Sequence, residues 1–147
     1  MRDDIVISIH SDQDMVAARA ESRRLADSLG FSRTDATLIA TAISEIARNI
    51  LVHAGHGEIS MRQVREEKRY GMVVVARDSG PGIRDVSRAA ESGFASTGGM
   101  GLGLPGARRL MDEFQLESNP GEGTTVTMTK WRMRDELERL RERRRGA

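Results

Sequence analysis

The sequence of 147 residues contains no cysteine. This absence excludes a disulfide scaffold, a cysteine nucleophile and a zinc site built on thiolates, and it is consistent with a reducing compartment. The three histidines, His10, His53 and His56, have no recognisable metal-ligand spacing, so we interpret them as ordinary polar positions. A chain of this length buries about two-thirds of its unfolded surface, so we expect one self-sufficient domain.

Aromatic residues and long apolar runs are also scarce. Three phenylalanines, one tryptophan and one tyrosine provide no platform on which single-stranded bases would stack. Ile5, Ile7 and Ile9 alternate with other residues near the N-terminus, and no uninterrupted apolar stretch resembles a signal peptide or a membrane span. We therefore expect a soluble, cytoplasmic protein with no membrane partner.

Positive and negative charges nearly cancel, with 23 Lys and Arg against 22 Asp and Glu. Residues 130–147 hold eight basic and four acidic side chains, which leaves the rest of the chain with a net charge of −3. We divide the chain into a domain at 1–131 and a charged helical tail at 132–147. Leu137 and Leu140 in this charged run are typical of a solvated terminal helix or a partner contact, and nucleic acid is the less favoured partner.

Apolar periodicity, capping residues and glycines predict the order of the secondary structure. Strands are expected at 4–10, 58–64, 70–77, 115–118 and 124–131. Helices are expected from Ser11 or Asp12 to Gly30, from Ser32 or Thr34 to His53, over 104–114 and in the tail. The first helix is expected to bury Met15, Val16, Ala18, Leu25 and Leu29. This order suits an α+β fold, a two-layer α/β sandwich with a mixed, mostly antiparallel sheet and helices on one face.

Glu45, Asn49 and His53 follow one another at intervals of four in the second predicted helix, so their side chains point in similar directions. On a helical wheel this polar stripe borders the apolar face of the helix. A carboxylate and an amide at that border must find hydrogen-bond partners or face a cavity, because burying them unpaired is costly. Taken alone, the stripe fits both a ligand site and ordinary hydrogen-bonded boundary positions.

Asp78 ends the predicted central strand and is followed by Ser79, Gly80, Pro81 and Gly82. Two glycines around a proline build ordinary turns. An aspartate at the end of a buried strand is also well placed to accept a hydrogen bond from a ligand amino group. Both interpretations stay open for this motif alone.

A second glycine-rich motif runs from Gly98 to Gly106 into a helix. Its glycines let backbone amides approach anionic oxygens, and Pro105 suits the first turn of a helix whose positive end would face them. It is neither a Walker loop, because no Gly-Lys-Ser/Thr follows, nor a dinucleotide fingerprint, because no strand immediately precedes it. A further turn, Gly121 to Thr125, enters the last predicted strand. Together the four motifs predict a nucleotide site.

The four motifs resemble the conserved boxes of the GHKL superfamily of ATPases and kinases. Glu45–Asn49 resembles the N box, Asp78–Gly82 the G1 box, Gly99–Leu104 the G2 box and Gly121–Thr124 the G3 box. The resemblance covers nearly the whole chain and implies the Bergerat fold. The segments at 41–50, 93–94 and 104–114 are most similar to the RsbT-type serine/threonine switch kinases of the stressosome. The basic tail and the short lid between Gly82 and Gly98 depart from that pattern.

The resemblance implies a role for each matching residue toward ATP and Mg²⁺. Asp78 would bind the adenine amino group with help from Thr124, Asn49 would coordinate Mg²⁺, and Glu45 would act as the base toward a serine or threonine hydroxyl. The glycine boxes would hold the nucleotide, with the triphosphate under the amides of the loop from Gly99 to Gly103. By this resemblance, the nucleotide-binding positions in these boxes would be Gly80, Gly82, Gly99, Gly101, Leu102, Gly103 and Gly123.

The resemblance also implies partners. The substrates would be STAS-domain stressosome proteins resembling RsbS and RsbR, and the released kinase would bind and activate a PP2C-type phosphatase resembling RsbU. One alternative is an anti-sigma factor kinase of the RsbW or SpoIIAB type, which sequesters a sigma factor. Another is a module that binds ATP without transfer, although intact Glu45 and Asn49 argue against it. A homodimer stays open because anti-sigma relatives dimerise, and His53 is a poor phosphoacceptor candidate.

Overall fold

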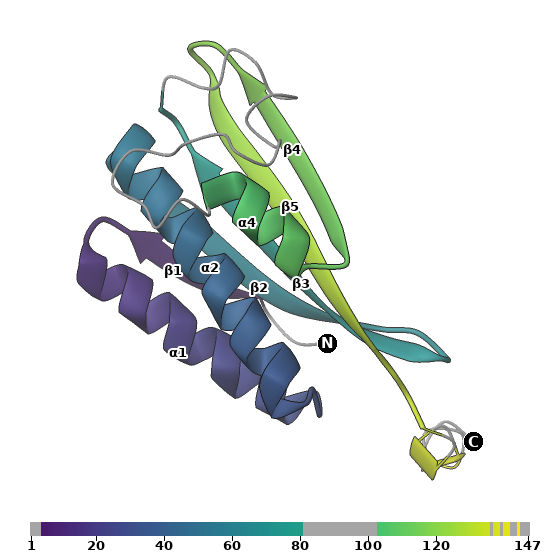
Figure 1. The fold of residues 1–147 in the computed structure, drawn as a ribbon. Helices are drawn as coiled ribbons and strands as arrows, with labels where there is room; N and C mark the ends of the chain where they lie inside the picture. Colours follow the sequence, from purple (N-terminus) through teal and green to yellow (C-terminus); the bar gives the residue numbers. More distant parts are fainter. Residues whose placement is uncertain (1–3, 81–102, 136, 139, 142–143, 145–147) are drawn as a thin grey trace.

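The computed structural model describes residues 4–80, 103–135, 137–138, 140–141 and 144. The elements follow the order β1 (Ile5–Ile9), α1 (Asp12–Ser28), α2 (Arg33–His53), β2 (Gly57–Arg65), β3 (Arg69–Asp78), α4 (Gly103–Leu110), β4 (Glu113–Asn119) and β5 (Gly123–Met133). In this described part the helices cover one face of a five-stranded sheet (Figure 1). The expected two-layer α+β sandwich is therefore confirmed. Within the same residues, no helix has the length and apolar character needed to cross a membrane.

Both long helices begin at serine caps. The Ser11 side chain accepts a hydrogen bond from the backbone N of Asp14, whose carboxylate accepts one from the Ser11 backbone N, which completes a capping box. Ser32 caps α2, and its hydroxyl accepts a hydrogen bond from the backbone N of Asp35 at 3.0 Å. Gly30 joins the helices at φ +80°, a conformation that glycine adopts without strain. The predicted limits of both helices are confirmed.

The sheet has the order β1-β2-β3-β5-β4, and all the described pairings are antiparallel. The predicted hairpin of β2 and β3 and the central position of β3 are confirmed. Ile59, Ala76 and Val126 lie side by side in the register and are buried under the helices. The residues next to them along each strand therefore face away from the helices.

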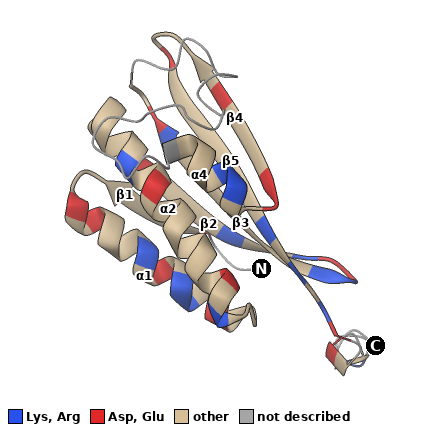
Figure 2. Ribbon diagram, viewed as in Figure 1, with Lys and Arg blue, Asp and Glu red and all other residues tan. Residues whose placement is uncertain are grey.

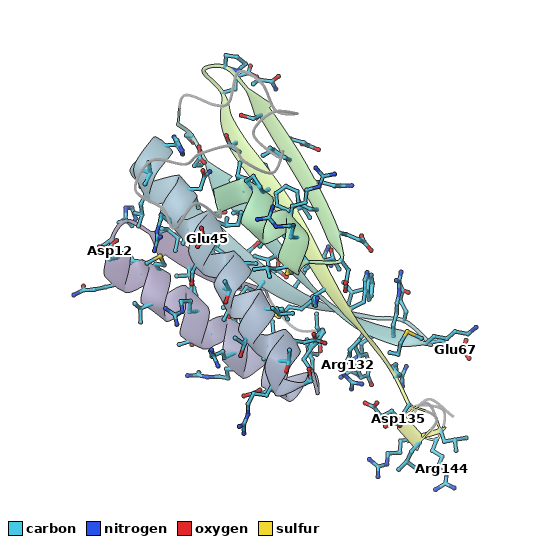
Figure 3. All side chains as sticks on the ribbon, in the orientation of Figure 1. Asp12, Glu45, Glu67, Arg132, Asp135 and Arg144 are labelled. Atoms are coloured by element: carbon cyan, nitrogen blue, oxygen red, sulfur yellow. The ribbon has the colours of Figure 1, made fainter. Side chains whose placement is uncertain are left out.

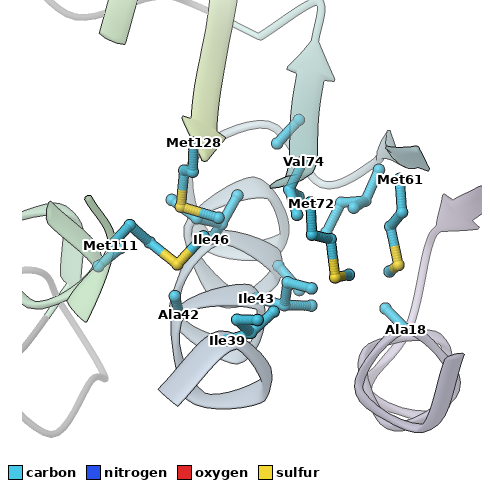
Figure 4. Packing of buried hydrophobic residues seen from close by; sticks show 14 of the residues in the cluster. Ala18, Ile39, Ala42, Ile43, Ile46, Met61, Met72, Val74, Met111 and Met128 are labelled. Atoms are coloured by element: carbon cyan, nitrogen blue, oxygen red, sulfur yellow. The ribbon is translucent and has the colours of Figure 1, made fainter. Parts of the chain in front are cut away.

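The core fills the space between the helices and the sheet (Figure 4). Methionines from the sheet side pack against the isoleucines of α2, and their flexible side chains suit such an irregular gap. One core prediction is wrong, because Val16 is 57% exposed on the solvent side of α1. Of the other residues expected in the α1 stripe, Ala18, Leu25 and Leu29 are buried and Met15 is partly buried against the core.

The helix predicted over 104–114 is wrong at its C-terminal end. The helix α4 ends at Leu110, and Phe114 belongs to β4, where it lies opposite Met128. The Lys130 ammonium donates a hydrogen bond to the Leu110 carbonyl at 3.0 Å, and a cation there suits the negative end of the helix. The backbone N of Asp112 then donates to a carbonyl of β5. These contacts from β5 end the helix and start the next strand.

The strand β5 continues past its predicted end at residue 131, and polar contacts hold the first turn of the tail against the domain. The Arg132 Nε donates to the Leu29 carbonyl at 2.6 Å, and both Arg132 Nη atoms donate to the Glu138 carboxylate. Arg134 is buried and donates to the Glu66 carbonyl at 3.0 Å. Arg132 thus joins Glu138 of the tail to the end of α1.

The Glu138 anchor predicts an acid-sensitive contribution to stability. The hydrogen bonds from Arg132 lower the pKa of Glu138 from its usual 4.5 to about 2. The contribution is therefore complete above about pH 4.5 and is lost as the pH falls through about 2. We expect Glu138→Gln to lower the free energy of unfolding at pH 7 by roughly 0.5 to 1 kcal/mol, a value that allows for solvent screening.

Thermal unfolding from pH 7 to pH 2 checks this expectation. The difference in Tm between wild type and Glu138→Gln should shrink as the pH falls below 4.5. The exposed Glu122 lies in the turn before β5 and provides the control, because Glu122→Gln should leave Tm unchanged throughout. A difference that stayed constant down to pH 2 would contradict the role assigned to the Glu138 carboxylate.

Candidate nucleotide-binding site

The helix α2 buries both polar side chains predicted for the N box. Glu45 is 6% exposed and Asn49 is 8% exposed, and they lie one helical turn apart on a helix packed against α4 and the sheet. His53, the third residue of the stripe, is exposed at the helix end. The structure therefore separates His53 from the two buried polar groups. A buried carboxylate and a buried amide one turn apart on one helix match the arrangement predicted for the N box.

Asp78 lies at the last position of β3, as predicted, with Gly57 of β2 on one side and Thr124 of β5 on the other. Its Oδ1 accepts a hydrogen bond from the Gly80 backbone N at 2.9 Å, which holds the carboxylate at the start of the turn. Aspartate often forms such turns with the backbone two residues on. The other carboxylate oxygen, Oδ2, takes no part in this bond.

Two glycines bring the end of α2 against this turn. A Cβ at Gly80 would lie 2.6 Å from the Ala54 Cβ, at the C-cap of α2. A Cβ at Gly57 would lie 2.9 Å from the Ile50 Cγ2 and 3.1 Å from the Asp78 Cβ. Side chains larger than hydrogen would push these elements apart. Glycine at both positions therefore packs the N-box helix closely against the strand end that carries Asp78.

The turn before β5 approaches Asp78 from the opposite side. Gly123 has φ +88°, and a Cβ there would overlap the Asp78 carbonyl oxygen and lie 2.9 Å from the Ser79 Cα. Thr124 is buried next to it, and its Oγ1 lies 2.9 Å from the Ser118 Oγ, which also donates to the Gly123 carbonyl. The structure thus brings Gly123 and Thr124 together with Asp78 and Gly80.

The second glycine motif is described only in part. Gly103 is the first residue of α4, which packs against α2 beside the N box. Gly82, Gly99, Gly101 and Leu102 lie outside the described residues, so their predicted roles stay predictions. Figure 3 shows Glu45 on the part of α2 that lies beside α4. The described parts of all four motifs therefore lie on neighbouring elements.

A hollow of about 470 Å³ lies on the sheet face that points away from the helices. Its lining includes Ser8, Glu58, Arg77 and Thr125, which lie side by side in the register of β1, β2, β3 and β5. These residues alternate with the buried row that faces α2. The hollow is therefore on the reverse side of the sheet from Glu45 and Asn49, and it borders the candidate site at Asp78 and Ser79.

The described residues could bind Mg²⁺ only together with the phosphate groups of ATP. No cluster of three or more His, Cys, Asp or Glu side chains in the described parts of the chain would hold a metal by itself. The buried Asn49 amide offers one neutral oxygen of the type that Mg²⁺ prefers. Because Mg²⁺ commonly takes only one or two protein ligands, phosphate oxygens and water would supply the others.

The contact between Gly123 and Asp78 predicts a large effect of a small substitution. In Gly123→Ala the new methyl group would occupy the position of the Asp78 carbonyl, in a conformation that favours glycine. We expect a Tm several degrees lower and weaker ATP binding. The exposed Gly121 also has a positive φ but has no atom within 4 Å of an added Cβ, so Gly121→Ala is the matched control. Equal ATP affinity and Tm for the two variants would contradict this packing.

Comparison with known proteins identifies the family. A family model described as a histidine kinase-like ATPase domain matches residues 10–130. The chain therefore belongs to the histidine kinase-like ATPase domain family and uses ATP.

Two solved structures share the fold, although identities this low show the fold alone. The RsbU and RsbW domains of Rv1364c from Mycobacterium tuberculosis align with TM-score 0.59 and 19% identity, over 90% of this chain and 33% of that chain. The SiaB-SiaC complex from Pseudomonas aeruginosa aligns with TM-score 0.54 and 11% identity, over 87% of this chain and 89% of that chain.

Curated relatives narrow the class. The serine/threonine-protein kinase RsbT of Bacillus subtilis (strain 168) is 47% identical over 131 residues, which are 89% of this chain and 98% of that protein. An anti-sigma F factor of Caldanaerobacter subterraneus subsp. tengcongensis is 34% identical over 99 residues, which are 63% of this chain and 68% of that protein. Within the ATPase family, the chain is a serine/threonine-protein kinase of the RsbT type.

Sequence reasoning missed two residues that shape the candidate site. Gly57 belongs to none of the four motifs, yet it is the point where Ile50 and Asp78 meet. Ser118 is the last residue of the strand predicted at 115–118, and its hydroxyl joins Gly123 and Thr124. The role of Gly57 depends on its contact with Asp78, which is distant in the sequence. The role of Ser118 depends on the hairpin that places β4 beside Gly123 and Thr124.

Proposed function

We propose that this chain transfers the γ-phosphoryl group of ATP to a serine or threonine of a STAS-domain protein, within a partner-switching module in the cytoplasm. The observation that carries the proposal is the burial of Glu45 and Asn49, one turn apart, on the helix that packs against the Asp78 turn. Residues 1–131 would form the kinase domain, and residues 132–147 a charged tail that begins within the last strand and contacts the domain.

Asp78 and Thr124 would bind the adenine end of the nucleotide. The Asp78 carboxylate is an acceptor suited to the adenine amino group, and the Gly80 amide holds it in place. When Ser118 donates its proton to the Gly123 carbonyl, the Thr124 hydroxyl donates to Ser118, which leaves the Thr124 oxygen to accept a further bond. Gly80, Gly82 and Gly123 would let the backbone approach the base closely.

Asn49 and the second glycine motif would hold the phosphate end. Asn49 would provide the amide oxygen for Mg²⁺, which when bound neutralises charge on the phosphates. Gly99, Gly101, Leu102 and Gly103 would present backbone amides to the triphosphate ahead of α4. Phosphoryl transfer depends mainly on positioning and charge stabilisation, so no lysine of the Walker type is required.

Glu45 would accept the proton of the attacking hydroxyl. It lies one helical turn before Asn49, so a base at this position would sit beside the phosphates that Asn49 helps to orient. The burial of Glu45 excludes most solvent from this carboxylate. A base shielded from water can act on a docked protein hydroxyl, and hydrolysis of ATP by water competes less with the transfer.

The partners would be STAS-domain proteins resembling RsbS and RsbR and a PP2C-type phosphatase resembling RsbU. The 47% identity to RsbT over most of both chains supports this set. A phosphate added to a docking surface disrupts that surface through charge and desolvation, which would release the kinase to the phosphatase.

Incubation with ATP and a purified cognate STAS-domain protein tests the proposal. We expect one phosphate on a serine or threonine of the STAS protein, detected by mass spectrometry of the tryptic peptides. A reaction without the kinase controls for contaminating activity. Unmodified STAS protein after a long incubation would overturn the proposed substrate.

A second candidate is an anti-sigma factor kinase, and the 34% identity to the anti-sigma F factor favours it. In that case the chain would bind a sigma factor tightly, and phosphorylation of its antagonist would regulate that binding. Titration calorimetry with the cognate sigma factor and with the phosphatase distinguishes the two. Binding to the sigma factor without binding to the phosphatase would favour this alternative.

A further inference from the structure

The hollow on the reverse face of the sheet is a second polar site beside the nucleotide site. Its volume of about 470 Å³ lies within the range of roughly 300 to 1,000 Å³ that is typical of small-molecule pockets. Side chains from four neighbouring strands line it in one row, namely Ser8, Glu58, Arg77 and Thr125. The proposed kinase reaction uses none of these four side chains.

The ends of β3 and β5 divide their side chains between the two sites. Successive residues of a strand point to opposite faces of the sheet. Asp78 and Thr124 pair with each other and belong to the nucleotide site. Their neighbours Arg77 and Thr125 also pair with each other, and they line the hollow. The strands that hold the adenine end of the nucleotide site therefore also hold the hollow, on the other face of the sheet.

Two histidines that are distant in the sequence form part of the wall of the hollow. His10 follows β1 and His56 precedes β2, and their rings stack with centroids 5.8 Å apart and planes at 4°. They continue the β1–β2 register, in which Ile9 pairs with Gly57. The His10 backbone N donates to the Asp14 carboxylate at 2.8 Å, which joins this wall to the start of α1. Each imidazole offers nitrogen atoms that can donate or accept a hydrogen bond.

Glu58 and Arg77 bring opposite charges to the hollow without pairing with each other. They are partners in the β2–β3 register, where Cβ atoms lie about 4.5 to 5.5 Å apart. Both side chains are exposed, and among the described residues neither forms an ion pair or a side-chain hydrogen bond. Figure 2 shows an acidic and a basic position next to each other where β3 ends. An unpaired cation and an unpaired anion in one polar hollow suit a ligand that carries both charges.

The closeness of these two charges favours an α-amino acid as the ligand. Its carboxylate and ammonium groups are on the same carbon atom, so they can reach two neighbouring register positions at once. Arginine binds carboxylates in a bidentate manner, and a glutamate accepts hydrogen bonds from an ammonium group. A simple anion would be repelled by Glu58 and a simple cation by Arg77. The hydroxyls and imidazoles of the hollow would contact a polar side chain of the ligand.

We propose that the hollow binds a free polar α-amino acid, with its carboxylate on Arg77 and its ammonium group on Glu58. This binding goes beyond the proposed function and does not depend on it, because it involves neither ATP nor a STAS-domain protein. The amino acid and ATP would lie on opposite faces of the same strands, so both could be bound at the same time.

Titration calorimetry of the purified wild type with each of the common L-amino acids, without ATP, tests the site. We expect at least one polar amino acid to bind with one molecule per chain. Arg77→Gln and Glu58→Gln should each weaken that binding about 10- to 100-fold, because each removes a charged hydrogen-bonding group. Both residues are exposed, so these variants should keep the wild-type Tm. Arg62→Gln is the matched control, because Arg62 is exposed on the same face of β2 but does not line the hollow, and it should keep wild-type affinity.

Two analogues of the amino acid that binds assign its two ends. The α-carboxamide lacks the carboxylate and the N-acetyl derivative lacks the ammonium group, so each should bind wild type more weakly. The carboxamide should bind wild type and Arg77→Gln about equally, because both changes remove the same contact. For the same reason the N-acetyl derivative should bind wild type and Glu58→Gln about equally. Absence of binding by every amino acid, or equal affinity of wild type and both charge variants for the amino acid, would overturn the proposal.

Addition of ATP and of inorganic phosphate separates the alternatives. Saturating ATP should leave the affinity for the amino acid nearly unchanged. Competition between the two would overturn the proposal, because the amino acid would then occupy the nucleotide site. Inorganic phosphate that bound the hollow as tightly as any amino acid would also overturn it, because the hollow would then be a site for anions alone. Failure of wild type to bind ATP would reject the proposed function but leave the amino-acid site in place.

Discussion

Replacing Glu45 by alanine is expected to reduce phosphoryl transfer to the STAS-domain protein by about 10²- to 10⁴-fold while ATP binding is retained. The expected effect is large because the carboxylate would accept the proton of the attacking hydroxyl. ATP affinity should change little because the groups assigned to the nucleotide are Asp78, Thr124, Asn49 and the glycine motifs. Single-turnover transfer and calorimetry with ATP measure the two quantities separately.

Two variants separate chemistry from packing at this position. Glu45→Gln keeps the volume of the buried side chain and should lose transfer as fully as Glu45→Ala. Thr37→Ala changes an exposed residue on the same helix, whose hydroxyl donates only to the Arg33 carbonyl among the contacts described, and it should keep full activity. Normal transfer by Glu45→Gln would reject the base assignment.

Asp78→Asn is expected to weaken ATP binding by about 10- to 100-fold, because it removes a charged acceptor worth roughly 1.5 to 3 kcal/mol. Asparagine has the same shape, and its side-chain oxygen can still accept the hydrogen bond from the Gly80 amide, so the turn should persist. The loss should therefore appear in the Kd for ATP and leave Tm nearly unchanged.

The control for this variant is Glu58→Gln, on the neighbouring strand. Glu58 lies opposite Arg77 in the register and lines the hollow on the reverse face of the sheet. It should bind ATP as wild type does. If Asp78→Asn kept wild-type affinity, the adenine end of the nucleotide would have to bind elsewhere.

Local sequence signals predicted the main elements because their determinants are close in the chain. Ser11 and Ser32 cap helices through residues three positions on, and Gly30 provides the positive φ between them. Asp78 follows an apolar run of a length typical of a buried strand. Such signals can be recognised from a few neighbouring residues.

The predictions that failed depend on distant contacts. Phe114 continues a helical pattern from α4, but its pairing with Met128 in β5 places it in a strand. Val16 fits the apolar stripe of α1, yet α2 and the sheet pack against other residues of that helix. The convergence of the candidate site similarly depends on Gly57 and Gly123, whose closest neighbours lie on other elements.

Titration of the purified chain with ATP, with and without Mg²⁺, tests the central claim most directly. The account predicts one ATP bound per chain and tighter binding with Mg²⁺, with the gain from Mg²⁺ reduced in Asn49→Ala. No heat of binding from folded wild type in either condition would contradict it, because the separate motifs on α2, β3, α4 and β5 would then not form a nucleotide site.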